Sequence, residues 1–202
     1  MNEVRWAEDG GDEAVADHVA AALAEGGFVA LPGGGTPPPI LRDLAARELP
    51  WDRLVFSLTD DREVPVEHKA SNYRMLSECL GETGARLVRF APVWEGLRFR
   101  LVWAGMGTDG HVASIFPGVE LAGEAAPDLV RVRPDPLPPE APYARVTLNY
   151  EALVNTEELI LVIRGAAKRR VVEEVLAGSD HLPIAHLLAA ANCPVTIFWS
   201  ET

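Results

Sequence analysis

The stretch FVALPGGGTPPPILRDLAARELPWDRLVFSLT, residues 28–59, indicates the fold class of the chain. It begins with an apolar run of strand length at residues 28–32 and ends with a second one at residues 53–59. Between them stand a loop rich in glycine and proline and an amphipathic segment that predicts a helix near residues 39–48. Strand, helix and strand in this order form a βαβ unit, whose two strands lie parallel in one sheet. We therefore expect an α/β fold.

The alternation of strands and helices continues on both sides of this unit. Helices are predicted at residues 12–25, 71–80 and 166–178, and strands at residues 85–90, 98–105, 158–165 and 193–199. Such alternation favours a mainly parallel sheet with helices on both faces. The expected architecture is a three-layer α/β sandwich with a Rossmann-like central sheet.

Size and composition are typical of one domain. The chain has 202 residues, of which 48% are hydrophobic and 24% charged, so we expect residues 1–202 to form a single domain. Residues 131–148 include five prolines between Pro134 and Pro142, too many for a helix or a central strand. We interpret this segment as an extended surface connection.

Charge and cysteine content exclude several classes of protein. With 18 Lys and Arg against 30 Asp and Glu, the net charge is −12, which repels nucleic acids and anionic membranes. No apolar run approaches the ~20 residues that span a bilayer, and the N-terminus has no apolar signal-peptide core. Cys79 and Cys193 form no C-x-x-C pair, and the histidines show no metal-ligand spacing. These features favour a cytoplasmic protein.

Polar residues follow four of the predicted strands. Ligands of parallel α/β sheets bind beyond the carboxyl ends of the strands. The residues at these ends are Thr36, then Asp60, Asp61 and Arg62, then Asp109 and His111, and finally Lys168. Because these ends meet at one edge of the sheet, the sequence predicts a ligand site there.

The first loop has two interpretations. The backbone amides of Gly34, Gly35 and Thr36 are suited to bind a phosphate, with Thr36 at a helix N-cap, although a plain tight turn is the alternative. The loop lacks the G-K-[ST] ending of a nucleotide P-loop, which disfavours a nucleoside triphosphate. Prolines at 37–39 lack an amide proton, so we expect the helix to begin near Pro39.

The segment AGMGTDGHVASIFPG, residues 104–118, contains the pattern G-x-G-x-x-G. A dinucleotide site needs a long helix after the third glycine, but Pro117 and Gly118 end any helix within two turns. The glycines instead predict a tight turn that presents Asp109 and His111. An imidazole titrates near neutral pH, which favours His111 as a general base, with a structural histidine as the alternative.

The charged loops also have alternatives. Consecutive strand residues point to opposite faces, so one of Asp60 and Asp61 is expected to face the site and the other solvent. On the residues alone, a solvated acidic turn with Arg62 as counter-ion is favoured. Lys168 lies in the first turn of a helix, where the helix dipole disfavours a cation. The neighbouring arginines, 169 and 170, are interpreted as a surface turn paired with glutamates 173 and 174.

Five blocks together resemble the 6-phosphogluconolactonase family of the sugar-phosphate isomerase/deaminase-like superfamily. They are LPGGGTPPPILRDLA, WDRLVFSLTDDREVPVEHKASNYRML, AGMGTDGHVASIFPG, ARVTLNYEALVNTEELILVIRGAAKRRVVEEVL and LPIAHLL. The resemblance implies hydrolysis of 6-phospho-D-glucono-1,5-lactone to 6-phosphogluconate in the pentose phosphate pathway, without metal or organic cofactor. We expect a monomer. The alternatives are an enzyme like glucosamine-6-phosphate deaminase or isomerase, and a non-catalytic sugar-phosphate sensor.

The resemblance also assigns roles to residues. His111 matches the catalytic histidine that activates water, and Arg62 and Asp109 join it at the catalytic centre. The positions implied for substrate or phosphate contacts are Gly34, Gly35, Thr36, Asp60, Arg145 and Lys168. The sequence departs from the family pattern D-E-R, because it reads Asp60-Asp61-Arg62.

Overall fold

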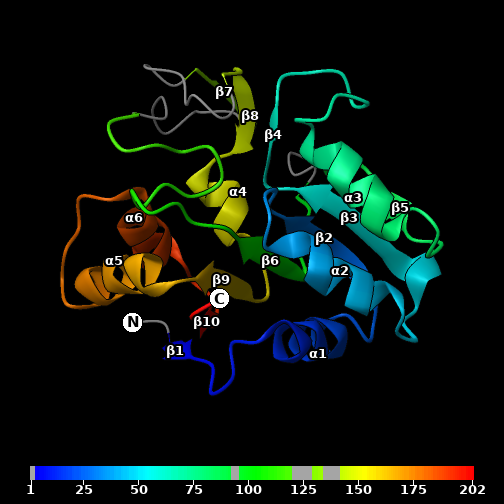
Figure 1. Cartoon of the computed structure of the whole chain (residues 1–202), viewed down its shortest axis with the longest axis horizontal. Helices are drawn as coiled ribbons and strands as arrows, with labels where there is room; N and C mark the ends of the chain where they lie inside the picture. The colour runs from blue at the N-terminus through cyan, green and yellow to red at the C-terminus, as the bar shows by residue number, and fades with distance from the viewer. Residues whose placement is uncertain (1–2, 92–95, 120–128, 134–141) are drawn as a thin grey trace.

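A computed structural model of the chain describes residues 3–91, 96–119, 129–133 and 142–202. Its centre is a seven-stranded sheet in the order β1-β10-β9-β6-β2-β3-β5 (Figure 1). All neighbouring strands are parallel. The strands are β1 (Val4–Trp6), β2 (Gly27–Leu31), β3 (Leu54–Leu58), β5 (Arg86–Leu87), β6 (Leu101–Ala104), β9 (Leu159–Arg164) and β10 (Val195–Ser200).

Helices cover both faces of this sheet. One layer holds α1 (Asp12–Ala22), α2 (Pro37–Ala45) and α3 (Asn72–Leu80), and the other holds α4 (Tyr150–Val154), α5 (Ala166–Leu176) and α6 (Pro183–Ala190) (Figure 1). Side chains that alternate along β2 enter different cores: Val29 and Leu31 pack with α1 to α3, whereas Ala30 packs with α4 to α6. The expected three-layer α/β sandwich is confirmed.

The strand order creates a crevice between β2 and β6. From β2 the chain proceeds to β3 and β5 on one side, and later to β6, β9 and β10 on the other side. The loops that follow β2 and β6 therefore diverge above two neighbouring strands, which is where open α/β sheets bind ligands. These loops carry Gly34, Gly35 and Thr36 on one side and Asp109 and His111 on the other.

A second, antiparallel sheet lies above these strand ends in Figure 1. It contains β4 (Asp60–Arg62), β8 (Arg145–Leu148) and β7 (Leu129–Val132), in that order. Thr59 joins the two sheets, because its N–H donates to the carbonyl of Leu31 (2.9 Å) and its carbonyl accepts from Leu148 N (2.8 Å). Asp60 and Arg62 are therefore placed on a wall above the main sheet.

This small sheet corrects the interpretation of residues 131–148 as an extended surface connection. Arg131 and Val132 at one end and residues 145–148 at the other form paired strands. The β-branched residues outside the proline-rich segment keep their amide protons and can form a ladder. The segment 134–141, which holds four of the five prolines, lies outside the described residues.

Several boundaries differ from those predicted. Helix α2 begins at Pro37 rather than near Pro39, because the first turn of a helix needs no amide protons and tolerates proline. The strand predicted at 85–90 is limited to Arg86–Leu87, and the first helix ends at Ala22. β1, α4 and the short 3-10 helix η1 (Trp51–Arg53) were not predicted, because each is too short to show a periodic pattern.

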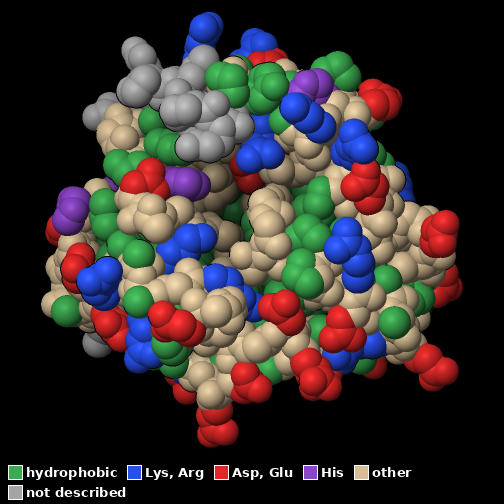
Figure 2. Space-filling view, in the orientation of Figure 1, with side chains coloured by type: hydrophobic (Ala, Val, Ile, Leu, Met, Phe, Trp, Pro, Cys, Tyr) green, Lys and Arg blue, Asp and Glu red, His purple; other side chains and the backbone are tan. Residues whose placement is uncertain are grey.

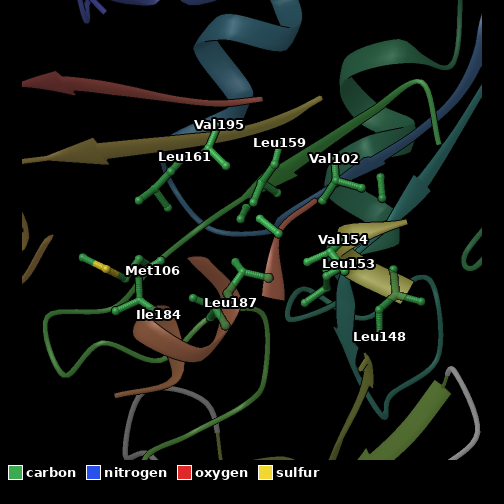
Figure 3. Close-up of a cluster of buried hydrophobic side chains, with 14 of the residues drawn as sticks. Val102, Met106, Leu148, Leu153, Val154, Leu159, Leu161, Ile184, Leu187 and Val195 are labelled. Atoms are coloured by element: carbon green, nitrogen blue, oxygen red, sulfur yellow. The ribbon is translucent and has the colours of Figure 1, made fainter. Parts of the chain in front are cut away.

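The loop after β6 is anchored in the core on one side of the sheet. Figure 3 shows Met106, from this loop, beside Ile184 of α6, with Leu161 of β9 and Leu187 of α6 in the same cluster. All four side chains are at most 4% exposed. The chain is therefore fixed five residues before His111.

Candidate active site

A cavity of about 250 Å³ opens at the carboxyl ends of the parallel strands. The predicted site residues that line it are Gly34, Gly35, Thr36, Asp60, Arg62, His111, Arg145 and Lys168. The remaining one, Asp109, contacts His111 instead. In Figure 2, Lys and Arg side chains surround a hollow near the centre of the visible face. Segments far apart in the sequence thus meet around one cavity, as the sheet-edge argument predicted.

His111 and Asp109 form a close pair. The distance from His111 Nδ1 to Asp109 Oδ1 is 2.6 Å, and the same oxygen accepts the backbone N–H of His111 at 3.2 Å. The ring of Phe116 packs beside the imidazole, with 4.8 Å between centroids. A carboxylate at Nδ1 favours the tautomer with the proton on Nδ1, which leaves a lone pair on Nε2. This arrangement is suited to accept a proton at the edge of the cavity.

Two glycines make the turn around His111 feasible. A Cβ on Gly107 would lie 2.3 Å from ring atoms of His111 and 2.5 Å from Asp109 Oδ1. Gly110 has φ of 78°, a left-handed conformation that favours glycine, and its carbonyl accepts the N–H of Ile184 in the first turn of α6 at 3.0 Å. The glycine pattern therefore serves a tight turn, as predicted, and no helix follows it within residues 111–119.

Asp60 and Asp61 are both buried, so the expectation that one faces solvent is wrong. Asp60 lines the cavity and is 7% exposed, whereas Asp61 is fully buried on the other side of the strand. Asp61 accepts hydrogen bonds from Arg89 Nε (2.8 Å), from Asn72 N (2.6 Å) and from Ser71 Oγ (3.2 Å). These partners replace water, so the solvated acidic turn is also wrong.

Asn72 connects Arg62 to Asp60. Arg62 Nη1 donates to the carbonyl of Ala70 (2.9 Å) and to Asn72 Oδ1 (3.1 Å), and Asn72 Nδ2 donates to the carbonyl of Asp60 (2.8 Å). Gly33 leaves the space for this amide, because a Cβ there would lie 2.0 Å from Asn72 Oδ1. Asn72 was not predicted from the sequence, although it directly follows Ser71, a residue type that commonly caps helices and that caps α3 here.

Charges of both signs lie on the wall that the small sheet forms. Arg62 and Arg145 are register partners on β4 and β8, and the guanidinium of Arg145 lies 5.1 Å from the ring centre of Phe116. Burial raises the pKa of Asp60, and this effect is opposed by a hydrogen bond from Ser114 and by the two arginines. Burial and the charge of Arg62 lower the pKa of Arg145. The wall therefore combines two cations with one carboxylate.

Lys168 faces the cavity from the first turn of α5, where it was predicted. Burial lowers the pKa of its ammonium group, Arg164 lowers it further, and Asp109 opposes the shift. Arg169 behaves differently: its Nε donates to Glu173 Oε1 at 2.7 Å, and its guanidinium lies 4.3 Å from the ring centre of Trp199. The prediction of a paired surface turn is confirmed for Arg169.

The loop after β2 presents free backbone donors. No described residue accepts a hydrogen bond from the amides of residues 33–36. A Cβ on Gly34 or Gly35 would meet nothing within 4 Å, so the space above both is open. Thr36 occupies the N-cap position of α2 as expected, but its hydroxyl makes no capping hydrogen bond. These groups are available to an anion in the cavity.

The described residues offer neither a metal site nor a membrane span. Over the ranges that the structure describes, no group of three or more His, Cys, Asp or Glu side chains is arranged to hold a metal ion. No helix in those same ranges is long and apolar enough to cross a membrane.

Comparisons with known proteins agree with the resemblance seen in the sequence. The family model described as glucosamine-6-phosphate isomerases/6-phosphogluconolactonase matches residues 7–93 and 82–199. The chain is 33% identical to the 6-phosphogluconolactonase of Rhizobium meliloti (strain 1021), with 93% of each chain covered. It is 32% identical to that of Helicobacter pylori (strain J99), with 86% of this chain and 83% of the relative covered.

Solved structures give the same result. A 6-phosphogluconolactonase from Shewanella baltica OS155 superposes with a TM-score of 0.82 at 25% identity, covering 99% of this chain and 98% of the other. The 6-phosphogluconolactonase from Thermotoga maritima gives a TM-score of 0.79 at 26% identity, covering 98% and 99%. The resemblance is confirmed, and the chain belongs to the glucosamine-6-phosphate isomerase/6-phosphogluconolactonase family.

Proposed function

We propose that this protein hydrolyses 6-phospho-D-glucono-1,5-lactone to 6-phosphogluconate, a step of the pentose phosphate pathway. The proposal is supported by relatives named 6-phosphogluconolactonase, which cover most of the chain. The observation that carries it is the His111–Asp109 pair at the rim of a cavity whose other walls hold Arg62, Arg145 and Lys168. A base and three cations are the groups that hydrolysis of an anionic lactone requires.

The reaction starts with His111 as general base. Nε2 takes a proton from a water molecule while the water oxygen attacks the lactone carbonyl carbon, and the carbonyl oxygen becomes an oxyanion. Arg62 stabilises this developing negative charge. The bond from the carbonyl carbon to the ring oxygen then breaks, and the protonated imidazole returns its proton to that oxygen. Asp109 holds the imidazole in place throughout.

The phosphate is held away from the reacting carbon. We assign it to the amides of Gly34, Gly35 and Thr36 together with Arg145 and Lys168. A dianionic phosphate favours the charged form of Lys168 and offsets its unfavourable position at the N-terminus of a helix. Local cations thereby allow a chain of net charge −12 to bind an anion.

Asp60 favours a second candidate function, that of an amino-sugar phosphate deaminase or isomerase. Such chemistry needs a carboxylate base beside the second carbon of the sugar. Asp60 is a carboxylate on the cavity wall, and the matched family description includes glucosamine-6-phosphate isomerases. A non-catalytic sugar-phosphate sensor would use the same cavity without turnover.

One set of assays separates these functions. Lactone hydrolysis is followed above its spontaneous rate for the wild type, for His111→Ala and for His18→Ala, a control histidine that pairs with Glu158 outside the cavity. We expect His111→Ala to lower kcat by roughly 10²- to 10⁴-fold and the control to leave it unchanged. Equal rates in both variants would reject His111 as the base. Ammonia release from glucosamine 6-phosphate would favour a deaminase, and 6-phosphogluconate binding without turnover a sensor.

The proposed steps use protein side chains alone. Imidazole supplies the base and guanidinium the electrostatic stabilisation, so we propose a metal-independent enzyme without an organic cofactor. The single domain over residues 1–202, the monomeric state and the cytoplasmic location stay predictions.

A further inference from the structure

The turn that follows His111 contains a residue in an unfavourable conformation. Val112 and Ile115 exchange two backbone hydrogen bonds, of 3.2 and 2.8 Å, so Ala113 and Ser114 form the centre of a tight turn. Ala113 has φ of 49°, in the left-handed region, and it is the only described residue other than glycine with a positive φ. Such a conformation costs free energy for alanine and persists only where its surroundings hold it. Ala113 also lines the cavity.

Ser114 supplies the contacts that hold this turn. Its side chain is fully buried, and its Oγ donates to Asp60 Oδ2 at 2.5 Å. Its backbone N–H donates to Thr147 Oγ1 at 3.2 Å. Asp60 belongs to β4 and Thr147 to β8, so both bonds fasten the turn to the small sheet. The same sheet carries Arg62.

These contacts also give a reason for a carboxylate in an anion site. Asp60 repels an anionic substrate, which makes it costly at this position unless it has another task. One of its oxygens is occupied by Ser114, a residue 54 positions away in the sequence. The bond joins the strand of Arg62 to the turn of His111, the two residues that we propose as oxyanion stabiliser and general base.

We propose that Ser114 is a positioning residue for the lactonase reaction. Through Asp60 and Thr147 it keeps Ala113 in the left-handed conformation and thereby keeps His111 at its distance from Arg62. The inference rests on the proposed function, and Ser114 itself does not touch the substrate.

The first test is a comparison of two buried serines. Ser114→Ala removes the hydroxyl beneath the turn, whereas Ser57→Ala removes a hydroxyl that donates to the carbonyl of Val29 outside the cavity. We expect Ser114→Ala to lower kcat roughly 10- to 100-fold, because small misplacements of a catalytic group have this effect. KM should stay within about threefold, since most of the groups assigned to the phosphate, the amides of residues 34–36 and Lys168, lie outside the small sheet, and only Arg145 lies within it. Ser57→Ala should leave kcat unchanged although it also loses a buried hydrogen bond.

The second test is rescue by glycine. Glycine adopts the left-handed conformation at no steric cost, so the double variant Ser114→Ala with Ala113→Gly should recover most of the lost kcat. Thr147→Val removes the acceptor of the Ser114 N–H, together with a hydroxyl that donates to the carbonyl of Leu148 (3.1 Å), and is expected to lower kcat in the same direction by a smaller factor. It also serves as the alternative variant if Ser114→Ala does not fold.

A measurement without turnover separates this inference from the proposed function. The imidazole resonances of His111, assigned by their absence in His111→Ala, are recorded by NMR with labelled histidine. We expect them to shift in Ser114→Ala and to return in the double variant. Inactive wild-type protein would refute the proposed function alone. Unchanged kcat and unchanged His111 resonances in folded Ser114→Ala, or failure of glycine to restore them, would overturn the role of Ser114.

Discussion

His111 and Asp109 can meet because residue 107 has no side chain. A Cβ at this position would overlap the imidazole and the carboxylate, with separations of 2.3 and 2.5 Å. Gly107→Ala is therefore expected to push the pair apart and to lower kcat roughly 10- to 100-fold, with little change in KM. Steady-state kinetics of lactone hydrolysis measure both constants. Gly11→Ala, at the remote N-cap of α1, is the control, and equal kcat values for the two variants would contradict this geometry.

Without a ligand, the charged side chain of Lys168 is expected to lower the free energy of unfolding. Its folded-state pKa lies below the ordinary 10.5, so the unfolded chain binds more protons between these two values. The free energy of unfolding therefore rises with pH across that interval, and near neutral pH the charged lysine is a penalty.

Lys168→Met should consequently raise the melting temperature at pH 7 while it weakens 6-phosphogluconate binding. The increase should shrink as the pH approaches 10.5. Thermal denaturation at several pH values and calorimetric titration with 6-phosphogluconate provide the two readouts. A variant that melts lower at pH 7, or one that binds as tightly as the wild type, would contradict the assignment.

Single residues were predictable where the chemistry is local. Thr36, Asp60, His111 and Lys168 follow apolar runs and were found from that position, while Arg145 was found through the resemblance. The supporting residues were missed because each acts through a partner far along the chain. Arg89 donates a hydrogen bond to Asp61, 28 positions away, and Ser114 donates one to Asp60, 54 positions away. The spacing of apolar residues along the sequence indicates neither contact.

At the scale of elements, Asp61 fastens α3 to β4. Its carboxylate accepts from the first amide of α3, at Asn72, and pairs with Arg89, whose side chain is 32% exposed. Asp61→Asn removes the charge that both bonds use. We expect a loss of about 1.5–3 kcal/mol in the free energy of unfolding, the usual range for a hydrogen bond to a charged group.

Urea denaturation measures this loss. Asp17→Asn is the matched control, because Asp17 is exposed and pairs with Arg47 on the surface, where ion pairs contribute at most about 1 kcal/mol. Equal losses in the free energy of unfolding for both substitutions would show that the buried hydrogen bonds of Asp61 contribute no more than a surface ion pair.

The elements themselves were predictable when they were long and periodic. Six of the seven parallel strands, all except β1, and the helices α1, α2, α3 and α5 followed from runs of apolar residues, with errors of a few residues at their ends. The small sheet was not predicted, because β4 has only three residues and holds two aspartates and an arginine. Those residues form a strand only because β8 pairs with them, which is a tertiary effect.

In the molecule as a whole, residues of both sheets line the cavity, such as Trp103 of β6 and Arg62 of β4, so a bound ligand is expected to hold the two sheets together. 6-Phosphogluconate at about 100 times its Kd should raise the free energy of unfolding by about 2.7 kcal/mol. For a chain of this size the melting temperature should then rise by roughly 5–10 °C. Gluconate, which lacks the phosphate, is the control in the same thermal shift assay, and an equal shift with gluconate would contradict a phosphate site.

The antiparallel pairing of Arg62 with Arg145 has a consequence for how the chain folds during its synthesis. A nascent chain of 90 residues already contains Asp60 and Asp61 of β4. It still lacks Ser114, Thr147 and Arg145, with which β4 interacts in the folded protein. The cavity therefore cannot bind a ligand until the second half of the chain has been synthesised. β9 and β10 also follow Arg145 in the sequence, so the parallel sheet and the cavity are both completed only near the end of translation.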